Sequence, residues 1–189
     1  MAQTDWRQAE AKNALLNTGN EDVMSEPKVH GAGVTPYGIY LLAESYHASA
    51  DFLNSARDWH FRFSDHPLRL LYFQALENYL RSFLRLGGKK PEEIRRYSHD
   101  FVAMLDDSTA LGLSVRKDVE DFIRSSTKRG DYVQIRYHFV LREGEDRRKQ
   151  PSIEALENAV SQLEKAVRMA IEATGIEIIP RAKSERGNG

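Results

Sequence analysis

The stretch that decides the fold is Pro67–Leu105, which reads PLRLLYFQALENYLRSFLRLGGKKPEEIRRYSHDFVAML. Its first half repeats apolar residues every three or four positions behind a proline, which is typical of an amphipathic helix. The apolar side holds Leu68, Tyr72, Ala75, Leu76, Tyr79, Leu80, Phe83 and Leu86. The opposite, polar side holds Glu77, Asn78, Arg81 and Arg85.

The second half of this stretch predicts another helix that folds back on the first. Gly87-Gly88 supplies the backbone freedom that a helix end needs, and Pro91 begins the next helix. Glu92 and Glu93 would stabilise the positive end of its dipole. Ile94, Tyr97, Phe101, Val102 and Leu105 recur at helical spacing, so we expect the two helices to share an apolar seam.

Three segments together resemble the HEPN superfamily, the nucleotide-binding domains of higher eukaryotes and prokaryotes. They are SYHASADFL (45–53), the helix that ends in Gly-Gly, and RRYSHDFVAML (95–105). The resemblance covers roughly residues 36–175. It implies a compact helical bundle, often dimeric, from a family of metal-independent ribonucleases and of non-catalytic relatives that bind RNA, nucleotides or partner proteins.

The ribonucleases of this family carry an arginine, four to six residues and then a histidine. Arginine stabilises charge on the phosphate while histidine moves the proton of the 2′-hydroxyl. None of the six histidines, His30, His47, His60, His66, His99 and His138, has an arginine at that spacing. The chain therefore departs from the nuclease motif, and His99 near Arg95 and Arg96 is the catalytic candidate that remains.

Composition bounds the class of protein. A chain of 189 residues with 41% hydrophobic residues buries one good core, and a net charge of −1 gives no overall attraction to nucleic acid. Without cysteine there are no disulfides or thiolate metal sites. No secretion signal or membrane-length apolar run is recognisable, so we expect a cytoplasmic protein. The expected domains are a flexible segment over 1–34, a bundle over 35–180 and a disordered tail over 181–189.

Three further helices complete the expected bundle. Thr35-Pro36 caps a helix to about Phe63, whose Leu41, Ala48 and Phe52, widened by Leu42 and Leu53, would make it the central member. Ser114 would cap a helix that buries Val119 and Ile123 and ends at Gly130. Pro151-Ser152 begins the last helix, whose seven-residue repeat favours packing inside the bundle over a dimer seam.

Residues Tyr132–Leu141 change period, because apolar and polar residues alternate there. We expect a short extended segment, paired with 176–179 or with the same segment of a second subunit. One face would carry Tyr132, Gln134, Arg136 and His138, either as a pocket or as a solvated strand face. The expected fold is therefore an all-α, up-and-down bundle of about five helices with one short extended segment.

The hairpin tip carries the clearest basic patch: Arg81, Arg85, Lys89, Lys90, Arg95 and Arg96. On a continuous helix, His99 and Asp100 would project with these cations, away from the core. The patch is either a phosphate- or RNA-contacting surface or a solvated face with local ion pairs. The candidate binding residues are these cations with His99, Asp100, Tyr132, Arg136 and His138.

No pattern indicates a metal or another cofactor. Glu44 and His47 have the Glu-x-x-His spacing of di-iron bundles, but that chemistry needs a second such motif, which the sequence lacks. The resemblance leads us to expect a non-catalytic homodimer that binds RNA or a nucleotide. It also suggests that the protein is a component of a bacterial stress, toxin–antitoxin or defence system. The alternatives are a homodimeric protein-interaction module without a nucleic-acid ligand and a divergent metal-independent ribonuclease.

Overall fold

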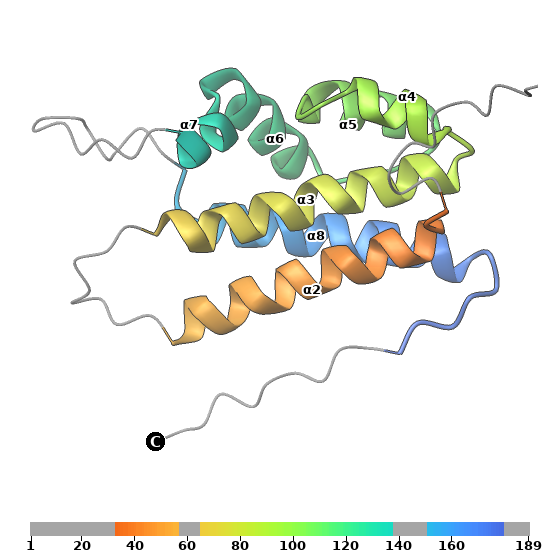
Figure 1. The fold of residues 1–189 in the computed structure, drawn as a ribbon, viewed down its shortest axis with the longest axis horizontal. Coiled ribbons are helices and arrows are strands. Elements are labelled where there is room, and N and C mark those ends of the chain that lie inside the picture. The colour runs from red at the N-terminus through yellow and green to blue at the C-terminus, as the bar shows by residue number, and fades with distance from the viewer. Residues whose placement is uncertain (1–32, 57–64, 138–150, 180–189) are drawn as a thin grey trace, which may run out of the picture. The chain divides into compact units, whose positions relative to one another are not determined.

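The structure is a computed structural model that describes residues 33–56, 65–137 and 151–179. Within these residues the chain is all-α, with seven helices and no strand (Figure 1). The helices are α2 (Pro36–Ser55), α3 (His66–Leu86), α4 (Pro91–Arg96), α5 (Phe101–Ala110), α6 (Lys117–Arg129), α7 (Asp131–Tyr137) and α8 (Ile153–Glu172). The class is as expected, with more and shorter helices than the five anticipated. The expected flexible segment and tail lie almost wholly outside the described residues.

Helix α3 is the centre of the bundle. It contacts α2 and α8 on one side and α4, α5 and α7 on the other, so it lies between two layers (Figure 1). The apolar side expected for α3 is buried, but so are Glu77 and Asn78, which were expected to face solvent. The central member is thus α3 and not the first helix, because the α4–α7 layer covers its polar side.

The turn after α3 confirms the expected hairpin. Gly88 has a φ of +88°, its N–H donates to the Arg85 carbonyl over 3.1 Å, and the Lys89 N–H donates to the Leu84 carbonyl over 3.0 Å. These two bonds satisfy the last carbonyls of the helix in a Schellman motif. Ile94, Phe101 and Leu105 are buried against the core, as the seam requires.

The second helix of the hairpin is broken, contrary to expectation. Ser98 adopts a left-handed φ of +52°, which ends α4 and starts a new helix at Phe101. The Asp100 side chain accepts a hydrogen bond from the Ala103 N–H over 3.0 Å and so caps α5. Because the helix is interrupted, Asp100 is a cap and does not pair with Arg96, and His99 leaves the α4 face that carries Arg95.

Helix α2 buries a different face from the one expected. Tyr40, Ala43, His47 and Ala50 are its buried residues, whereas Leu41, Leu42, Phe52 and Leu53 are exposed. Two alanines allow close approach to α3. The Tyr40 hydroxyl finds its polar partner in Glu164 of α8, and His47 finds its partner in Tyr79 of α3. The helix ends at Ser55, short of Phe63, and residues 57–64 lie outside the description.

The expected strand is wrong where the structure describes it. Residues 131–137 form α7, and 176–179 have no regular secondary structure. Tyr132 and Ile135 are buried while Val133 is half exposed, which is helical spacing. Gly130, with a φ of +69°, ends α6 as expected, although Arg116 and not Ser114 stands at the start of α6.

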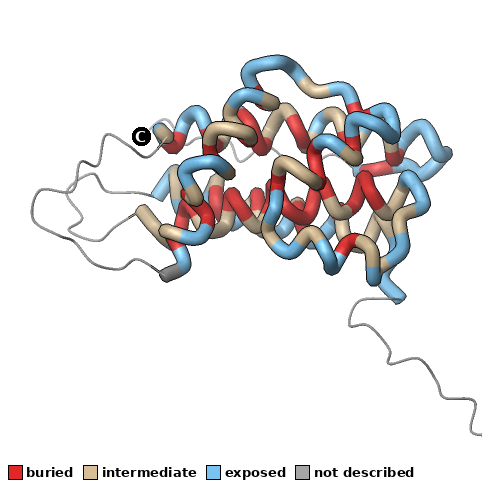
Figure 2. The backbone as a smooth tube through the Cα atoms, turned by 90° about the horizontal axis from the view of Figure 1, so that it is seen from above, coloured by how far each residue is buried: buried red, intermediate tan, exposed pale blue. Residues whose placement is uncertain are grey.

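Helix α8 packs inside the bundle, as favoured. Ser152 caps it by accepting from the Ala155 N–H over 3.1 Å. Most residues of its seven-residue repeat are buried against α3 and α6, namely Ile153, Leu156, Val160, Leu163 and Val167, whereas Thr174 of the same repeat is exposed beyond the end of the helix. Figure 2 shows the buried positions along the inner sides of the helices, with exposed positions on the outside. In the described part of the chain, no helix has both the length and the apolar character required to cross a membrane.

Candidate functional site

Two groups of candidate residues that are far apart in the sequence meet at His99. The loop between α4 and α5 brings His99 over the middle of α3, where its Nδ1 lies 3.2 Å from a carboxylate oxygen of Glu77. Its Nε2 lies 2.9 Å from Nη1 of Arg136 on α7, and its ring centroid lies 4.8 Å from that of Tyr132. We call Glu77, Arg81, His99, Tyr132 and Arg136 the His99 cluster.

Glu77 is the buried carboxylate at the bottom of this cluster. Only 1% of the residue is exposed, and it forms an ion pair with Arg81, one helical turn later, and a hydrogen bond with His99. A carboxylate so far from water requires such partners, since an unpaired buried charge costs several kcal/mol, of the order of 3–5. Arg81 also donates to the carbonyl of Ser98, which fixes the loop that carries His99.

The two neighbours of His99 define its tautomer. A guanidinium has only donors, so the hydrogen bond from Arg136 requires an unprotonated Nε2. The remaining ring proton is then on Nδ1 and is donated to Glu77. The result is a line of hydrogen bonds from a buried carboxylate, through a neutral imidazole, to an exposed arginine.

Helix α7 presents Arg136 and Tyr132 on the same side, one turn apart. The Arg136 guanidinium lies 5.4 Å from the Tyr132 ring centroid, a cation–π distance. Gln74 of α3 donates to the Tyr132 hydroxyl over 2.5 Å. Burial raises the pKa of Tyr132, and the Glu77 carboxylate raises it further, so this hydroxyl stays neutral.

A small pocket of about 120 Å³ opens beside His99. It is lined by Phe101 and Tyr132 and by the end of α6, including Ser126 and Thr127. The hydroxyl oxygens of Ser126 and Thr127 are buried and have no hydrogen-bond partner among the described residues; Ser126 is only 2% exposed. Buried hydroxyls are usually satisfied, so these two unpaired oxygens, which are closed to solvent in this conformation, are an exception in the wall of the pocket.

The expected basic patch is divided by the structure. Arg81 is paired with Glu77, the Arg85 Nη1 donates to the Lys89 carbonyl over 2.9 Å, and the Lys89 Nζ lies 2.9 Å from Asp107. Hydrogen bonds from Lys89 and then from Tyr97 lower the pKa of Asp107. These three cations therefore have partners within the fold.

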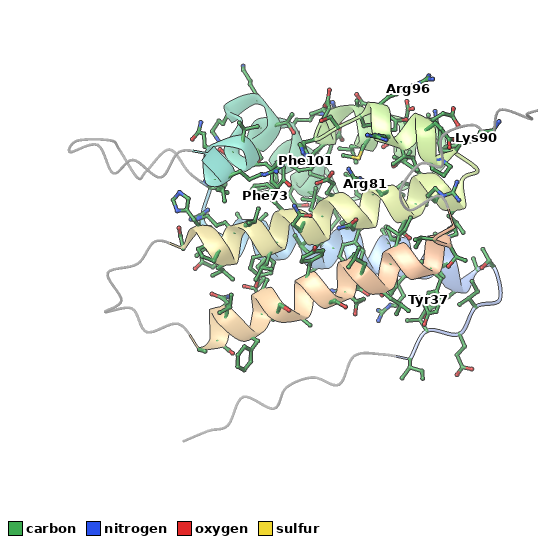
Figure 3. All side chains as sticks on the ribbon, in the orientation of Figure 1. Tyr37, Phe73, Arg81, Lys90, Arg96 and Phe101 are labelled. Carbon is green, nitrogen blue, oxygen red and sulfur yellow. The ribbon has the colours of Figure 1, made fainter. Side chains whose placement is uncertain are left out.

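Three other cations remain on the surface, which we call the α4 basic surface: Lys90, Arg95 and Arg96. All three are exposed, and none forms an ion pair with a residue that the structure describes. Figure 3 shows Lys90 and Arg96 at the outer edge of the molecule, whereas Arg81 lies between α3 and the α4–α5 layer. Arg136 is also exposed, while His138 lies outside the described residues.

A second polar network joins α2, α3 and α8. The Tyr79 hydroxyl donates to Glu44 and lies 3.2 Å from Nδ1 of His47, and the Tyr40 hydroxyl donates to Glu164 over 2.9 Å. Burial, followed by the neighbouring carboxylates, raises the pKa of both tyrosines. Glu44 and His47 thus share a tyrosine, and no cluster of three or more acidic or histidine side chains suited to a metal occurs in the described ranges.

Sequence reasoning missed Glu77, Gln74, Ser126 and Thr127. Glu77 stands one turn before Arg81 on the polar side of an amphipathic helix, which was the available signal for an ion pair. The contact between His99 and Arg136 joins residues 37 positions apart and leaves no local pattern. Comparison of the chain with protein-family models, with curated proteins and with solved structures gives no match.

Proposed function

We propose that this chain is a HEPN-like protein that binds a phosphate group of RNA or of a nucleotide at the His99 cluster, without catalysing a reaction. The hydrogen bond between Arg136 and Nε2 of His99 is the observation that supports this most directly. An anion that displaces it can accept from Arg136 and from a protonated His99. Because the sequence resembles the HEPN superfamily, we further propose that the protein belongs to a bacterial stress, toxin–antitoxin or defence system.

The surroundings suit an extended, single-stranded ligand. The pocket of about 120 Å³ accepts a group the size of a sugar or a base rather than a duplex, and rotation of the Ser126 or Thr127 side chain would let its hydroxyl bond that group. The α4 basic surface supplies three further cations for neighbouring phosphates. Phosphate neutralisation releases counterions, so binding by such a surface depends on salt.

Fluorescence anisotropy with a labelled single-stranded RNA in EDTA tests the proposal. Arg136→Ala should weaken binding at least about tenfold, because a hydrogen bond to a charged group contributes roughly 1.5–3 kcal/mol. The matched control is Arg116→Ala, an exposed arginine at the start of α6 that pairs only with Asp118 among the described residues. Absence of RNA and nucleotide binding by the wild type would instead favour a protein-interaction module.

The Glu77–His99 pair favours one second candidate, metal-independent cleavage of RNA. A histidine whose Nδ1 is held by a carboxylate presents Nε2 as a base for the 2′-hydroxyl proton, and Arg136 would stabilise the phosphate charge. The arginine next to His99 is then Arg136 and neither Arg95 nor Arg96. If this candidate holds, purified protein in EDTA should cleave RNA, and His99→Ala should abolish the cleavage. Cleavage that survives the substitution excludes His99 as the base.

A further inference from the structure

The outer face of α2 is apolar and uncovered in the described structure. Leu41, Leu42, Phe52 and Leu53 are 45%, 48%, 72% and 41% exposed. These residues lie on the side opposite the buried Tyr40, Ala43, His47 and Ala50. Helix α2 also lies on the far side of α3 from the His99 cluster (Figure 1), so this face is independent of the proposed function.

The face carries no charged residue over about four turns, although 29% of the chain is charged. The two acidic residues of α2, Glu44 and Asp51, bond instead to Tyr79 and Tyr72 of α3. A surface helix is normally charged on its outer side, so a neutral apolar face marks an interaction surface.

The serines on this face already have hydrogen-bond partners. The Ser45 hydroxyl donates to the Leu41 carbonyl over 2.9 Å, and the Ser49 hydroxyl donates to the Ser45 carbonyl over 2.8 Å. Their donors therefore remain satisfied when water is removed. Covering the face leaves no new unpaired hydroxyl proton.

The residues of this face follow the same order of apolar and small side chains in both chain directions when counted from position 47. Leu41 and Leu53 are each six residues from it, Leu42 and Phe52 five, and Ser45 and Ser49 two. An antiparallel copy of the same helix would therefore place leucine against leucine or phenylalanine at both ends, with the small serines where the helices cross. This is the symmetry that a twofold, isologous interface requires.

We infer that the outer face of α2 binds the same face of a second copy of this chain, in antiparallel orientation. One helix per subunit covers less than the ~800 Å² per partner of a standard interface. We therefore expect a weak dimer, with a dissociation constant on the order of micromolar. We choose a second subunit as the partner because the residue pattern of the face is symmetric about position 47. Binding a segment of different sequence would not require that symmetry.

Sedimentation velocity of the full chain over about 1–200 μM tests this interface. The wild type should approach twice the monomer mass of 21.6 kDa. Phe52→Glu and Leu42→Glu should each weaken dimerisation at least tenfold and leave the helical circular dichroism unchanged. Met169→Glu is the control, because Met169 is 68% exposed on α8 and should change nothing. A wild type that stays monomeric over the whole concentration range overturns the inference.

Disulfide trapping tests the orientation, because the chain has no cysteine of its own. Mixed Leu41→Cys and Leu53→Cys proteins should cross-link to each other on mild oxidation. Each variant alone should not, since two copies of residue 41 lie about 18 Å apart along antiparallel helices. Cross-linking of each variant with itself, in preference to the mixture, contradicts the antiparallel arrangement.

Discussion

The Nδ1 of His99 lies 3.2 Å from the carboxylate of Glu77, which is 1% exposed, so an imidazole at the surface is held by a charge in the core. The same carboxylate pairs with Arg81. The position of His99 therefore depends on a residue of α3 that no ligand would contact directly.

We expect Glu77→Gln to lower the free energy of unfolding by about 2–4 kcal/mol, because it leaves Arg81 without a charged partner in a largely buried setting. Urea denaturation followed by circular dichroism measures the change. Glu92→Gln, an exposed residue at the start of α4, should stay within about 0.5 kcal/mol of the wild type. Equal effects of the two substitutions would contradict a structural role for the buried pair.

Alkaline pH should unfold the protein through its buried tyrosines. Burial is the largest cause that raises the pKa of Tyr40, Tyr72 and Tyr79. The folded state therefore favours the protonated phenols: their contribution to stability is complete below pH ~10, the unfolded value, and is lost as pH rises above it. Above that pH, each tyrosine lowers the free energy of unfolding by up to about 1.4 kcal/mol per pH unit.

Urea titrations between neutral pH and pH ~11 measure this slope, and tyrosinate absorbance reports ionisation. Tyr72→Phe should reduce the slope by the share of one tyrosine. Ionisation of all tyrosines while the helical circular dichroism is intact would show that burial does not hold these hydroxyls neutral.

Gly88→Ala should destabilise the protein by about 1 kcal/mol, because Gly88 has a φ of +88° that side chains disfavour. No atom lies within 4 Å of an added Cβ, so the cost comes from the backbone alone. Thermal unfolding provides the measurement. Gly33→Ala, also without a neighbour within 4 Å but at an ordinary φ, is the control and should have no cost.

If RNA binds, its affinity should fall with salt through the α4 basic surface. Arg95→Ala together with Arg96→Ala should reduce the slope of log affinity against log salt by about 0.7 for each phosphate contact removed from single-stranded RNA. Anisotropy titrations at several salt concentrations give the slope. An unchanged slope would mean that these exposed arginines do not contact phosphates.

Local chemistry made much of the fold predictable. Thr35 and Ser152 cap their helices as expected, and Gly88 closes α3, because each effect depends on a few adjacent residues. The strand expected from Tyr132 failed because a short alternation also fits a helix that buries positions 132 and 135. Buried hydroxyl networks, which periodicity does not reveal, selected the buried face of α2.

The candidate site could be predicted only in part. His99, Arg81, Tyr132 and Arg136 were all candidates, yet they were assigned to two separate surfaces. A single left-handed residue, Ser98, redirects His99 from the α4 face toward α7. Tertiary contacts of this kind depend on how the helical layers pack. The hydrophobic periodicity of the two segments that carry His99 and Arg136 gives no information on that packing.

The central position of α3 also implies an order of assembly. Its contacts with α2 require closing only a short loop, whereas its contacts with α8 require closure over the segment from Gly87 to Ser152. Since closure entropy grows with loop length, the α2–α3 pair should form in the transition state and α8 should dock afterwards. Substitutions at the α2–α3 contact would then slow folding, and those on α8 would mainly speed unfolding.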